Sequence, residues 1–466
     1  MTVLKRVLVA NRGEIALRVI RACFDEGITS VLAASEADRD SLPARAADEV
    51  VTIGPASASA SYLNVGAVVS AALLMGCDGL HPGYGFLSER PELAEACARH
   101  GVTFIGPPAD TIRRGGDKIA ARELARSLGI PVGAGSGSVT DAAEAAAVAA
   151  EVGYPVLLKA AAGGGGRGML RVETPEELPD AVARAGSEAQ AAFGDGRLYV
   201  EHYISDARHV EVQVLADSHG TVVHLGDRDC SFQRRYQKLV EEAPAAAVPA
   251  ELRRQIAEAA VTLMSALDYA GAGTVEFLVD VALNTFSFLE VNTRVQVEHP
   301  VTEMITGVDI VREQLRVAAG EPLSFAQSDV RLTGHAIEFR VNAEAPLAGF
   351  TPSPGTLEVW APPTGAGIRT DTHCFAGYAV PPHYDSLLAK SIYHGADRDA
   401  ALSLAARALD AFTVEGVETT LPLHRALVRH PDVRANRITT RWVEESFLPG
   451  WIRDNAQRRE SVESAQ

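Results

Sequence analysis

Residues 156–168 read VLLKAAAGGGGRG, a glycine-rich loop that directly follows a short apolar strand. Consecutive glycines expose backbone N–H groups that can surround phosphate oxygens, and they leave the loop free to close over a ligand. The chain contains no G-x-x-x-x-G-K-[ST] sequence, which excludes a P-loop, and the extended segment Met169–Val172 that comes next disfavours a dinucleotide fingerprint. A mobile hairpin loop without a ligand is the alternative interpretation. The loop favours a phosphate site whose candidate donors are Gly164, Gly165, Gly166 and Gly168.

The first 115 residues alternate short apolar runs with helical patterns. The expected elements are a strand at Arg6–Ala10, a helix at Glu14–Glu26, a strand at Ser30–Ala34, a helix at Val65–Gly76 and a strand at Gly79–Leu80. This alternation predicts a parallel, doubly wound sheet. Ligands of such sheets bind beyond the C-terminal ends of the strands, where the loops Asn11–Gly13 and His81–Gly85 fall.

From Asp117 to about Gly320 the pattern changes to helices mixed with alternating strands. Helices are expected at 141–151, 175–192 and 249–267, and strands at 156–159, 198–203, 209–215, 221–225, 274–280 and 285–291. From about His335 the chain mixes strands with one clear helix, Asp399–Phe412. The tail after Gly450 is polar, so we expect it to be frayed.

Composition limits the class of protein. A chain of 466 residues predicts about three domains, and 47% hydrophobic with 22% charged residues is close to the average of globular proteins. The net charge of −17 argues against binding nucleic acid or acidic membranes over a whole surface. No apolar run approaches the ~20 residues of a membrane helix, and no secretory signal is recognisable. The five cysteines are scattered without a C-x-x-C pair, which predicts reduced thiols in the cytoplasm and no structural zinc.

Two glutamates interrupt apolar strands. Glu276 and Glu290 each stand between two apolar residues. A carboxylate inside a buried strand is costly unless it is paired or bound to a metal. Asn292 lies two residues after Glu290 and so on the same strand face. These three oxygen ligands suit a Mg²⁺ ion held jointly with nucleotide phosphates, and a pair of glutamates salt-bridged to Lys or Arg is the alternative.

The segment Asn292–Pro300 reads NTRVQVEHP. If it is extended, Arg294, Gln296 and Glu298 project to one side and the two valines to the other. A guanidinium, an amide and a carboxylate would then converge beside the expected metal. Such a group can bind a small oxyanion, with Glu298 free to take a proton. A solvated strand face is the alternative.

Other basic residues could complete a phosphate site, although each taken alone is more often a surface residue: Lys118, Lys159, His209, Arg234, Arg235 and Lys238. Arg340 lies in an alternating segment beside Phe339 and Val341, where a lone guanidinium needs an anionic or carbonyl partner. A purely structural role for Arg340 is equally compatible with this pattern.

Together these stretches resemble the biotin carboxylase family, the ATP-grasp component of biotin-dependent carboxylases. The resemblance covers nearly the whole chain, from Leu8 to about Val443. It rests on long segments in order: LVANRGEIA at 8–16, HPGYGFLSE at 81–89, RDCS at 228–231, EEAP at 241–244 and EHPVTE at 298–303. It implies an N-terminal α/β domain at 1–115, an ATP-grasp domain at 116–334 with a mobile glycine-rich lid at about 131–205, a mixed α+β C-terminal domain at 335–450, and a polar tail at 451–466.

By position, the resemblance implies a role for each candidate residue. ATP or its phosphates would bind Lys118, Lys159, Glu201, His209, Gln233 and Lys238. Magnesium, or manganese, would bind Glu276, Glu290 and Asn292. The bicarbonate pocket would consist of Arg294, Gln296, the backbone of Val297, and Glu298 as the base, while Arg340 would stabilise the biotin enolate. The chain departs from the family pattern at Ala162, Leu170, His202 and Tyr236, which puts nucleotide affinity in question but removes no catalytic group.

The implied reaction is the ATP-dependent carboxylation of biotin by bicarbonate, through carboxyphosphate, as the first half-reaction of a biotin-dependent carboxylase. An acyl-CoA is the expected final acceptor, as in fatty acid biosynthesis, although a partner selects it. Family carriers hold biotin on the Lys of a Met-Lys-Met-type turn, and none of the five Met residues here has a Lys beside it. We therefore expect biotin on a separate carrier protein, a carboxyltransferase as second partner, and a cytoplasmic homodimer.

Two other functions remain open. One is an ATP-grasp ligase with a different carboxylate acceptor, which the long N- and C-terminal matches disfavour. The other is a catalytically silent nucleotide-binding scaffold of a larger complex. The presence of Glu298, Arg340 and Lys238 speaks against that second alternative.

Overall fold

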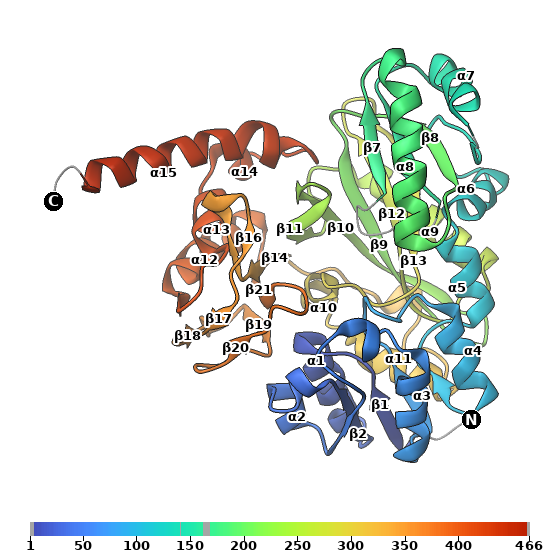
Figure 1. Cartoon of the computed structure of the whole chain (residues 1–466), viewed down its shortest axis with the longest axis vertical. Coiled ribbons are helices and arrows are strands. Elements are labelled where there is room, and N and C mark those ends of the chain that lie inside the picture. Colours follow the sequence, from blue (N-terminus) through green and yellow to red (C-terminus); the bar gives the residue numbers. More distant parts are fainter. Residues whose placement is uncertain (1–3, 140, 162–167, 464–466) are drawn as a thin grey trace.

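The computed structural model describes residues 4–139, 141–161 and 168–463 (Figure 1). Its N-terminal part is a parallel sheet with the strand order β3-β2-β1-β4-β5, as the sequence predicts. The strands are β1 (Arg6–Val9), β2 (Thr29–Ala34), β3 (Glu49–Thr52), β4 (Gly79–His81) and β5 (Thr103–Phe104), and the helices are α1 (Gly13–Asp25), α2 (Leu42–Ala46), α3 (Val65–Leu74) and α4 (Pro91–Arg99).

Helices cover both faces of this sheet. Val7 of β1 packs in one core with Ile15 of α1, whereas its neighbour Leu8 packs in a second core with Val68 of α3. A strand that is buried on both faces reads as a continuous apolar run, which is the pattern of residues 7–10. The sheet is therefore doubly wound.

The loops that follow β1 and β4 meet at the C-terminal edge of the sheet. The Nδ2 atom of Asn11 donates hydrogen bonds of 2.7 Å to the carbonyl oxygens of Pro82 and Tyr84. A cavity of about 490 Å³ lies at this edge, between these loops and residues 373–387. The edge at which the sequence places ligands thus contains a cavity.

The centre of the molecule is an antiparallel sheet with the order β13-β12-β9-β10-β11-β14-β21-β19. Its strands are β9 (Arg208–Ala216), β10 (Val222–Arg234), β11 (Gln237–Ala243), β12 (Gly271–Asp280), β13 (Thr285–Asn292), β14 (His335–Asn342), β19 (Ile368–Thr372) and β21 (Leu387–Gly395). Helices α5 (Ala109–Gly116), α6 (Lys118–Ser127), α9 (Ala250–Ala266), α10 (His299–Thr306) and α11 (Ile310–Ala318) belong to the same part of the chain. β11 pairs directly with β14, so backbone hydrogen bonds cross the position at which a domain boundary is expected.

A smaller antiparallel sheet, β7-β6-β8, forms the layer at the top right of Figure 1 together with α7 and α8. Its elements are β6 (Val156–Ala160), β7 (Met169–Val172), β8 (Leu198–His202), α7 (Ala142–Val152) and α8 (Leu178–Phe193). The expected phosphate donors Gly164, Gly165 and Gly166 lie outside the described residues. Gly168 has a φ of 74°, in the left-handed region that glycine adopts readily.

The C-terminal part combines β14, β21 and β19 with short strand pairs and helices. The strands are β15 (Glu344–Ala345), β16 (Thr351–Pro352), β17 (Gly355–Thr356), β18 (Val359–Ala361), β20 (Ala379–Val380) and β22 (Thr413–Glu415), and the helices are α12 (Arg398–Ala411), α13 (Leu421–Leu427), α14 (Pro431–Arg434) and α15 (Leu448–Glu463). One core joins Phe339 of β14, Tyr393 of β21 and Leu409 of α12.

The expectation of a frayed tail after Gly450 is wrong, because α15 continues to Glu463 and points away from the body of the molecule in Figure 1. Trp451 stacks on Phe447, with ring centroids 6.2 Å apart, and packs against the C-terminal core. This contact anchors the first turn. Residues 451–463 contain no Gly or Pro that would end the helix.

None of the helices within the described residues combines the length and the apolar character that crossing a membrane requires.

Candidate functional site

Three glutamates from three neighbouring strands form a row across the central sheet. Glu276 of β12 pairs in register with Glu211 of β9 on one side and with Glu290 of β13 on the other. Along β9, His209, Glu211 and Gln213 alternate and all are buried. Because the side chains of a strand alternate between faces, these polar groups share one face of the sheet. Burying so many polar groups is costly unless they bind one another or a ligand, so this row marks the candidate site.

Glu276 is the centre of the cluster. Its Oε1 lies 3.2 Å from Nζ of Lys238 and accepts hydrogen bonds of 3.0 Å each from the side-chain amides of Asn292 and Gln296. Its Oε2 lies 2.9 Å from Nε2 of His209. Burial alone would raise the pKa of Glu276, but Lys238 and His209 hold this pKa well below its usual range. The carboxylate is therefore ionised and ready to hold a cation.

The predicted metal ligands lie on two neighbouring strands, and their chemistry is that of a site for a divalent cation. Glu290 lies opposite Glu276, and Asn292 follows on the same strand, which gives two carboxylates and an amide oxygen. Cationic side chains balance these oxygens, because Nζ of Lys118 lies 2.6 Å from Oε2 of Glu290 and Arg294 donates to Oδ1 of Asn292 at 3.0 Å. The donor chemistry and the demand for positive charge both suit Mg²⁺.

Glu298 is held between two cations. Lys238 donates to its Oε1, and Nη2 of Arg340 lies 2.9 Å from its Oε2. Arg340 also binds Glu241, with Nε 2.6 Å from Oε1. Burial would raise the pKa of Glu298, but Lys238, Arg340 and Arg228 lower it well below its usual range. Glu298 has only 2% of its residue surface exposed, and its carboxylate is thus ionised and fixed in orientation.

Residues 292–298 do not form one extended strand, so the condition under which Arg294, Gln296 and Glu298 would share one side is not met. After β13 the chain becomes a loop and then a turn that leads into α10. Val295 is fully buried in the hydrophobic core that α1 shares with α11 and one face of the central sheet. Arg294 contacts Glu89, with Nε 2.9 Å from Oε2, and reaches the cluster around Glu276 only through Asn292. Gln296 donates to Glu276 itself, and Glu298 shares Lys238 with it.

Residues expected to bind nucleotide lie on two sides of this cluster. Glu201 of β8 binds the Nζ of Lys159 of β6, and also Arg122 of α6, which the sequence pattern did not reveal. Nδ1 of His209 lies 2.7 Å from Nε2 of Gln233. The expected nucleotide residues thus form pairs at the base of the β7-β6-β8 layer and beside the glutamate row.

Arg234 and Arg235 stay apart from the cluster. The Arg234 guanidinium stacks 4.1 Å from the ring centroid of Phe350, and the backbone N–H of Arg235 donates to Glu444 at 3.1 Å. Nη2 of Arg234 donates to the carbonyl oxygen of Gly349 at 3.2 Å, so these contacts lead away from the glutamate row. Packing against Phe350 is a sufficient reason for the arginine at 234.

Arg228 is the most important residue that the sequence pattern did not reveal. It is fully buried in β10, with Nε 2.5 Å from Oε1 of Glu211 and Nη1 2.7 Å from Oε1 of Gln213. Nη2 donates to Oε1 of Gln296 at 2.8 Å, so Arg228 orients the amide that binds Glu276. The alternation of polar residues at 209, 211 and 213 in an apolar strand was the available signal for Glu211 and its partner.

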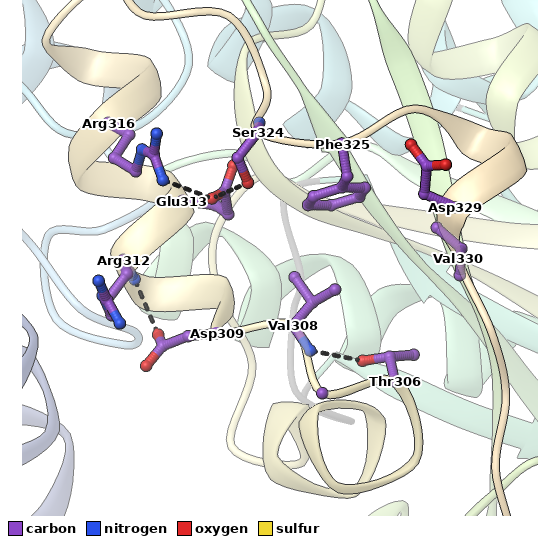
Figure 2. Close-up of a pocket in the computed structure, with 11 residues that line it drawn as sticks. Thr306, Val308, Asp309, Arg312, Glu313, Arg316, Ser324, Phe325, Asp329 and Val330 are labelled. Carbon is purple, nitrogen blue, oxygen red and sulfur yellow. Dashed lines mark hydrogen bonds and ion pairs between the residues drawn. The ribbon is translucent and has the colours of Figure 1, made fainter.

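A separate cavity of about 330 Å³ lies between α10, α11 and residues 324–330 (Figure 2). Its carboxylates are already occupied. Glu313 accepts hydrogen bonds from the backbone N–H and the hydroxyl of Ser324, and Asp309 accepts one from the backbone N–H of Arg312. This cavity is therefore a weaker candidate than the glutamate row.

The chain is similar to known proteins over nearly its whole length. Family models match three consecutive ranges: "Biotin carboxylase, N-terminal domain" at residues 3–112, "Carbamoyl-phosphate synthase L chain, ATP binding domain" at 117–326, and "Biotin carboxylase C-terminal domain" at 338–445. Biotin carboxylase 1 of Bacillus subtilis is 49% identical over 96% of this chain and 100% of its own length. A pyruvate carboxylase subunit of Methanothermobacter thermautotrophicus is 48% identical over 94% of this chain and 89% of its own length.

A solved structure is similar over the same length. The biotin carboxylase domain dimer of the 2-oxoglutarate carboxylase of Hydrogenobacter thermophilus, with MgADP, ADP and bicarbonate, superposes with a TM-score of 0.93. It is 46% identical, and the match covers 96% of this chain and 98% of that one. The predicted class, an N-terminal α/β domain, an ATP-grasp domain and a C-terminal domain, is confirmed. The chain belongs to the biotin carboxylase family of ATP-dependent ligases.

Proposed function

We propose that this chain carboxylates biotin on a separate carrier protein, at the expense of ATP and bicarbonate, as the first half-reaction of a biotin-dependent carboxylase. The observation that carries the proposal is the position of Glu298, which is buried between Lys238 and Arg340 and lies beside the hydrogen-bonded pair of Gln296 and Glu276. A base, two cations and an amide within one cluster meet the needs of a reaction between an oxyanion and a phosphoryl group.

Glu298 takes the proton of bicarbonate. Its two cationic partners keep it ionised before substrates bind, and they also make it a weak base. When Lys238 turns to the ATP phosphates and Arg340 turns to the ureido oxygen of biotin, both cations leave the carboxylate. Its pKa then rises, which favours proton transfer at the moment when the bicarbonate oxygen attacks the γ-phosphate.

Lys118, Lys159, His209, Gln233 and Glu201 bind the nucleotide, the lysines through its phosphates. Glu276, Glu290 and Asn292 would hold Mg²⁺, which would neutralise charge on the phosphates. Transfer of the γ-phosphoryl group to the bicarbonate oxygen breaks its bond to ADP, which leaves, and gives carboxyphosphate, which breaks down to CO₂ and phosphate.

The phosphate oxygen then takes the ureido proton of biotin, and Arg340 stabilises the resulting enolate oxygen while the nitrogen attacks CO₂. Closure of the lid at about 131–205 excludes the water that would hydrolyse carboxyphosphate. Arg294 completes the bicarbonate pocket together with Gln296 and the backbone of Val297.

Partner proteins would supply the biotin and accept the carboxyl group from it. We propose a biotin carrier protein and a carboxyltransferase as partners, an acyl-CoA as final acceptor, and a homodimer by analogy with the Hydrogenobacter thermophilus domain dimer. Pyruvate and 2-oxoglutarate, which the names of relatives mention, are the competing acceptors.

The proposal is tested by incubating the protein with MgATP, labelled bicarbonate and a biotinylated carrier domain. Label that is captured on avidin only when ATP and biotinylated carrier are both present supports it. Label that is transferred to the same carrier without biotin, or no transfer at all, contradicts it. Adding a carboxyltransferase with acetyl-CoA, pyruvate or 2-oxoglutarate then identifies the acceptor.

A further inference from the structure

One face of the C-terminal half of the central sheet is charged although it is buried. Arg340 of β14, Lys390 of β21 and Asp371 of β19 lie opposite one another in register. The neighbouring residues Phe339 and Ala389 point to the other face and belong to the C-terminal hydrophobic core. The sheet therefore separates a hydrophobic core from a layer of charges that faces the proposed active site.

Lys390 is the most deeply buried cation of this layer, with no exposed surface. Its Nζ lies 3.0 Å from Oε2 of Glu14, 3.8 Å from Oδ2 of Asp371 and 3.0 Å from the carbonyl oxygen of Val297. Burial lowers the pKa of Lys390, but Glu14 and Asp371 outweigh burial and raise this pKa above its usual value. Lys390 thus remains a charged donor.

Two of the three partners of Lys390, Glu14 and Val297, come from distant parts of the chain, and Asp371 lies on the neighbouring strand. Glu14 is in the first turn of α1, where Tyr84 of the loop after β4 donates to its other oxygen. Val297 stands in the turn between β13 and α10. The ammonium group of Lys390 therefore connects α1 of the N-terminal part, the C-terminal end of the central sheet and the turn before α10.

The contact with Val297 acts on Glu298. The carbonyl of Val297 and the backbone N–H of Glu298 belong to the same planar peptide unit, so a bond that fixes this carbonyl also fixes the Cα of Glu298. Glu298 itself is the N-cap of α10, which holds the other side of the turn. A small shift of this peptide would move the carboxylate relative to Lys238 and Arg340.

We propose that Lys390 is a positioning residue for bicarbonate: together with Glu14, it fixes the Val297–Glu298 peptide so that the Glu298 carboxylate faces its substrate. The inference rests on the proposed function of Glu298 as the base. Lys390 touches none of the reacting groups and acts through the backbone. Misplacement of a catalytic group by about 1 Å commonly costs about 10²-fold in rate.

The test measures bicarbonate-dependent ADP release, with biotin present, for Lys390→Met and Glu14→Gln. For Lys390→Met we expect kcat/KM for bicarbonate to fall ~10–100-fold while KM for ATP is little changed. Glu14→Gln keeps the lysine but removes its closest charged partner, and we expect a smaller loss in the same direction. If Lys390→Met does not fold, Glu14→Gln decides by itself.

Arg398→Met is the matched control, because Arg398 also joins a buried carboxylate, Glu242 at 2.6 Å, to a backbone carbonyl, that of Val433 at 2.7 Å. We expect this variant to melt earlier than wild type with an unchanged KM for bicarbonate. The positioning role would be overturned if Glu14→Gln raised KM for ATP by the same factor by which it lowered kcat/KM for bicarbonate. Wild-type kinetics in both test variants would also overturn it. A wild-type protein without bicarbonate-dependent ADP release would instead contradict the proposed function.

Discussion

Replacing Glu298 by Gln removes one charge and one acceptor oxygen with little change in volume. In the structure each oxygen of Glu298 binds a different cation, Lys238 on one side and Arg340 on the other. Gln offers a single acceptor oxygen and turns its NH₂ donors toward the second cation. The substitution therefore removes the proposed base and also misaligns one of the two cations.

The expected loss follows from these two effects. A general base contributes typically ~10²–10⁴-fold to a rate. Because Gln also loses one cation contact, we expect a loss near the upper end of this range, about 10³–10⁴-fold in biotin-dependent turnover. Such a loss corresponds to roughly 4–5.5 kcal/mol of transition-state stabilisation.

The assay is ADP release at saturating MgATP, bicarbonate and biotin, together with ATP affinity by equilibrium titration, which should change little. Glu242→Gln is the matched control, since Glu242 is also buried and is paired with Arg398 at 2.6 and 2.7 Å. Burial would raise the pKa of Glu242, but Arg398 and His335 lower it to about 2, so this control also removes a buried charge. The control should lose stability and keep turnover. Turnover of Glu298→Gln within a few-fold of wild type, or an equal loss in Glu242→Gln, would refute the assignment of the base.

The proposed metal site should respond to the loss of its charges. The double variant Glu276→Gln and Glu290→Gln should require a much higher Mg²⁺ concentration for activity, because two anionic ligands disappear from one site. An unchanged Mg²⁺ titration would mean that these carboxylates are structural. Glu338 is fully buried opposite Glu241, and its pKa is raised well above its usual value by burial and by that neighbour. Because the pKa of Glu338 is higher in the folded protein than its ordinary value of 4.5, the folded state loses stability as pH rises above about 4.5. The melting temperature of wild type should therefore fall relative to that of Glu338→Gln as pH rises from this value, and a constant difference would count against this. An avidin blot of residues 1–466 co-expressed with a biotin protein ligase should be blank, and a stoichiometric signal on one of its lysines would contradict a separate carrier.

The sequence alone predicts the helices and strands whose apolar pattern is complete within one short segment. β1 and α1 lie within a residue or two of the ranges expected from their apolar runs, because those runs are buried on the faces that they predict. Glu276 and Glu290 stood out for the same reason, since a charge inside an apolar strand is visible without tertiary information. Their pairing across β12 and β13 agrees with that interpretation.

Features that depend on tertiary contacts could not be read from the pattern. Val295 looks like one residue of an alternating strand, but in the fold it is buried in the core between α1 and the central sheet, and the neighbouring Arg294 contacts Glu89. Arg228 and Lys390 are single cations in ordinary strands, and only the fold reveals that their partners come from distant segments. Likewise α15 looks too polar to be ordered, and the stacking of Trp451 on Phe447 explains why its first turn is anchored.

The most direct test of the central claim is ADP release from MgATP with bicarbonate and biotin each withheld in turn. The proposed chemistry predicts full rate only when both are present, because the base at Glu298 serves bicarbonate and Arg340 serves biotin. ADP release that is independent of bicarbonate and biotin, or that requires a different carboxylate in place of bicarbonate, would contradict it.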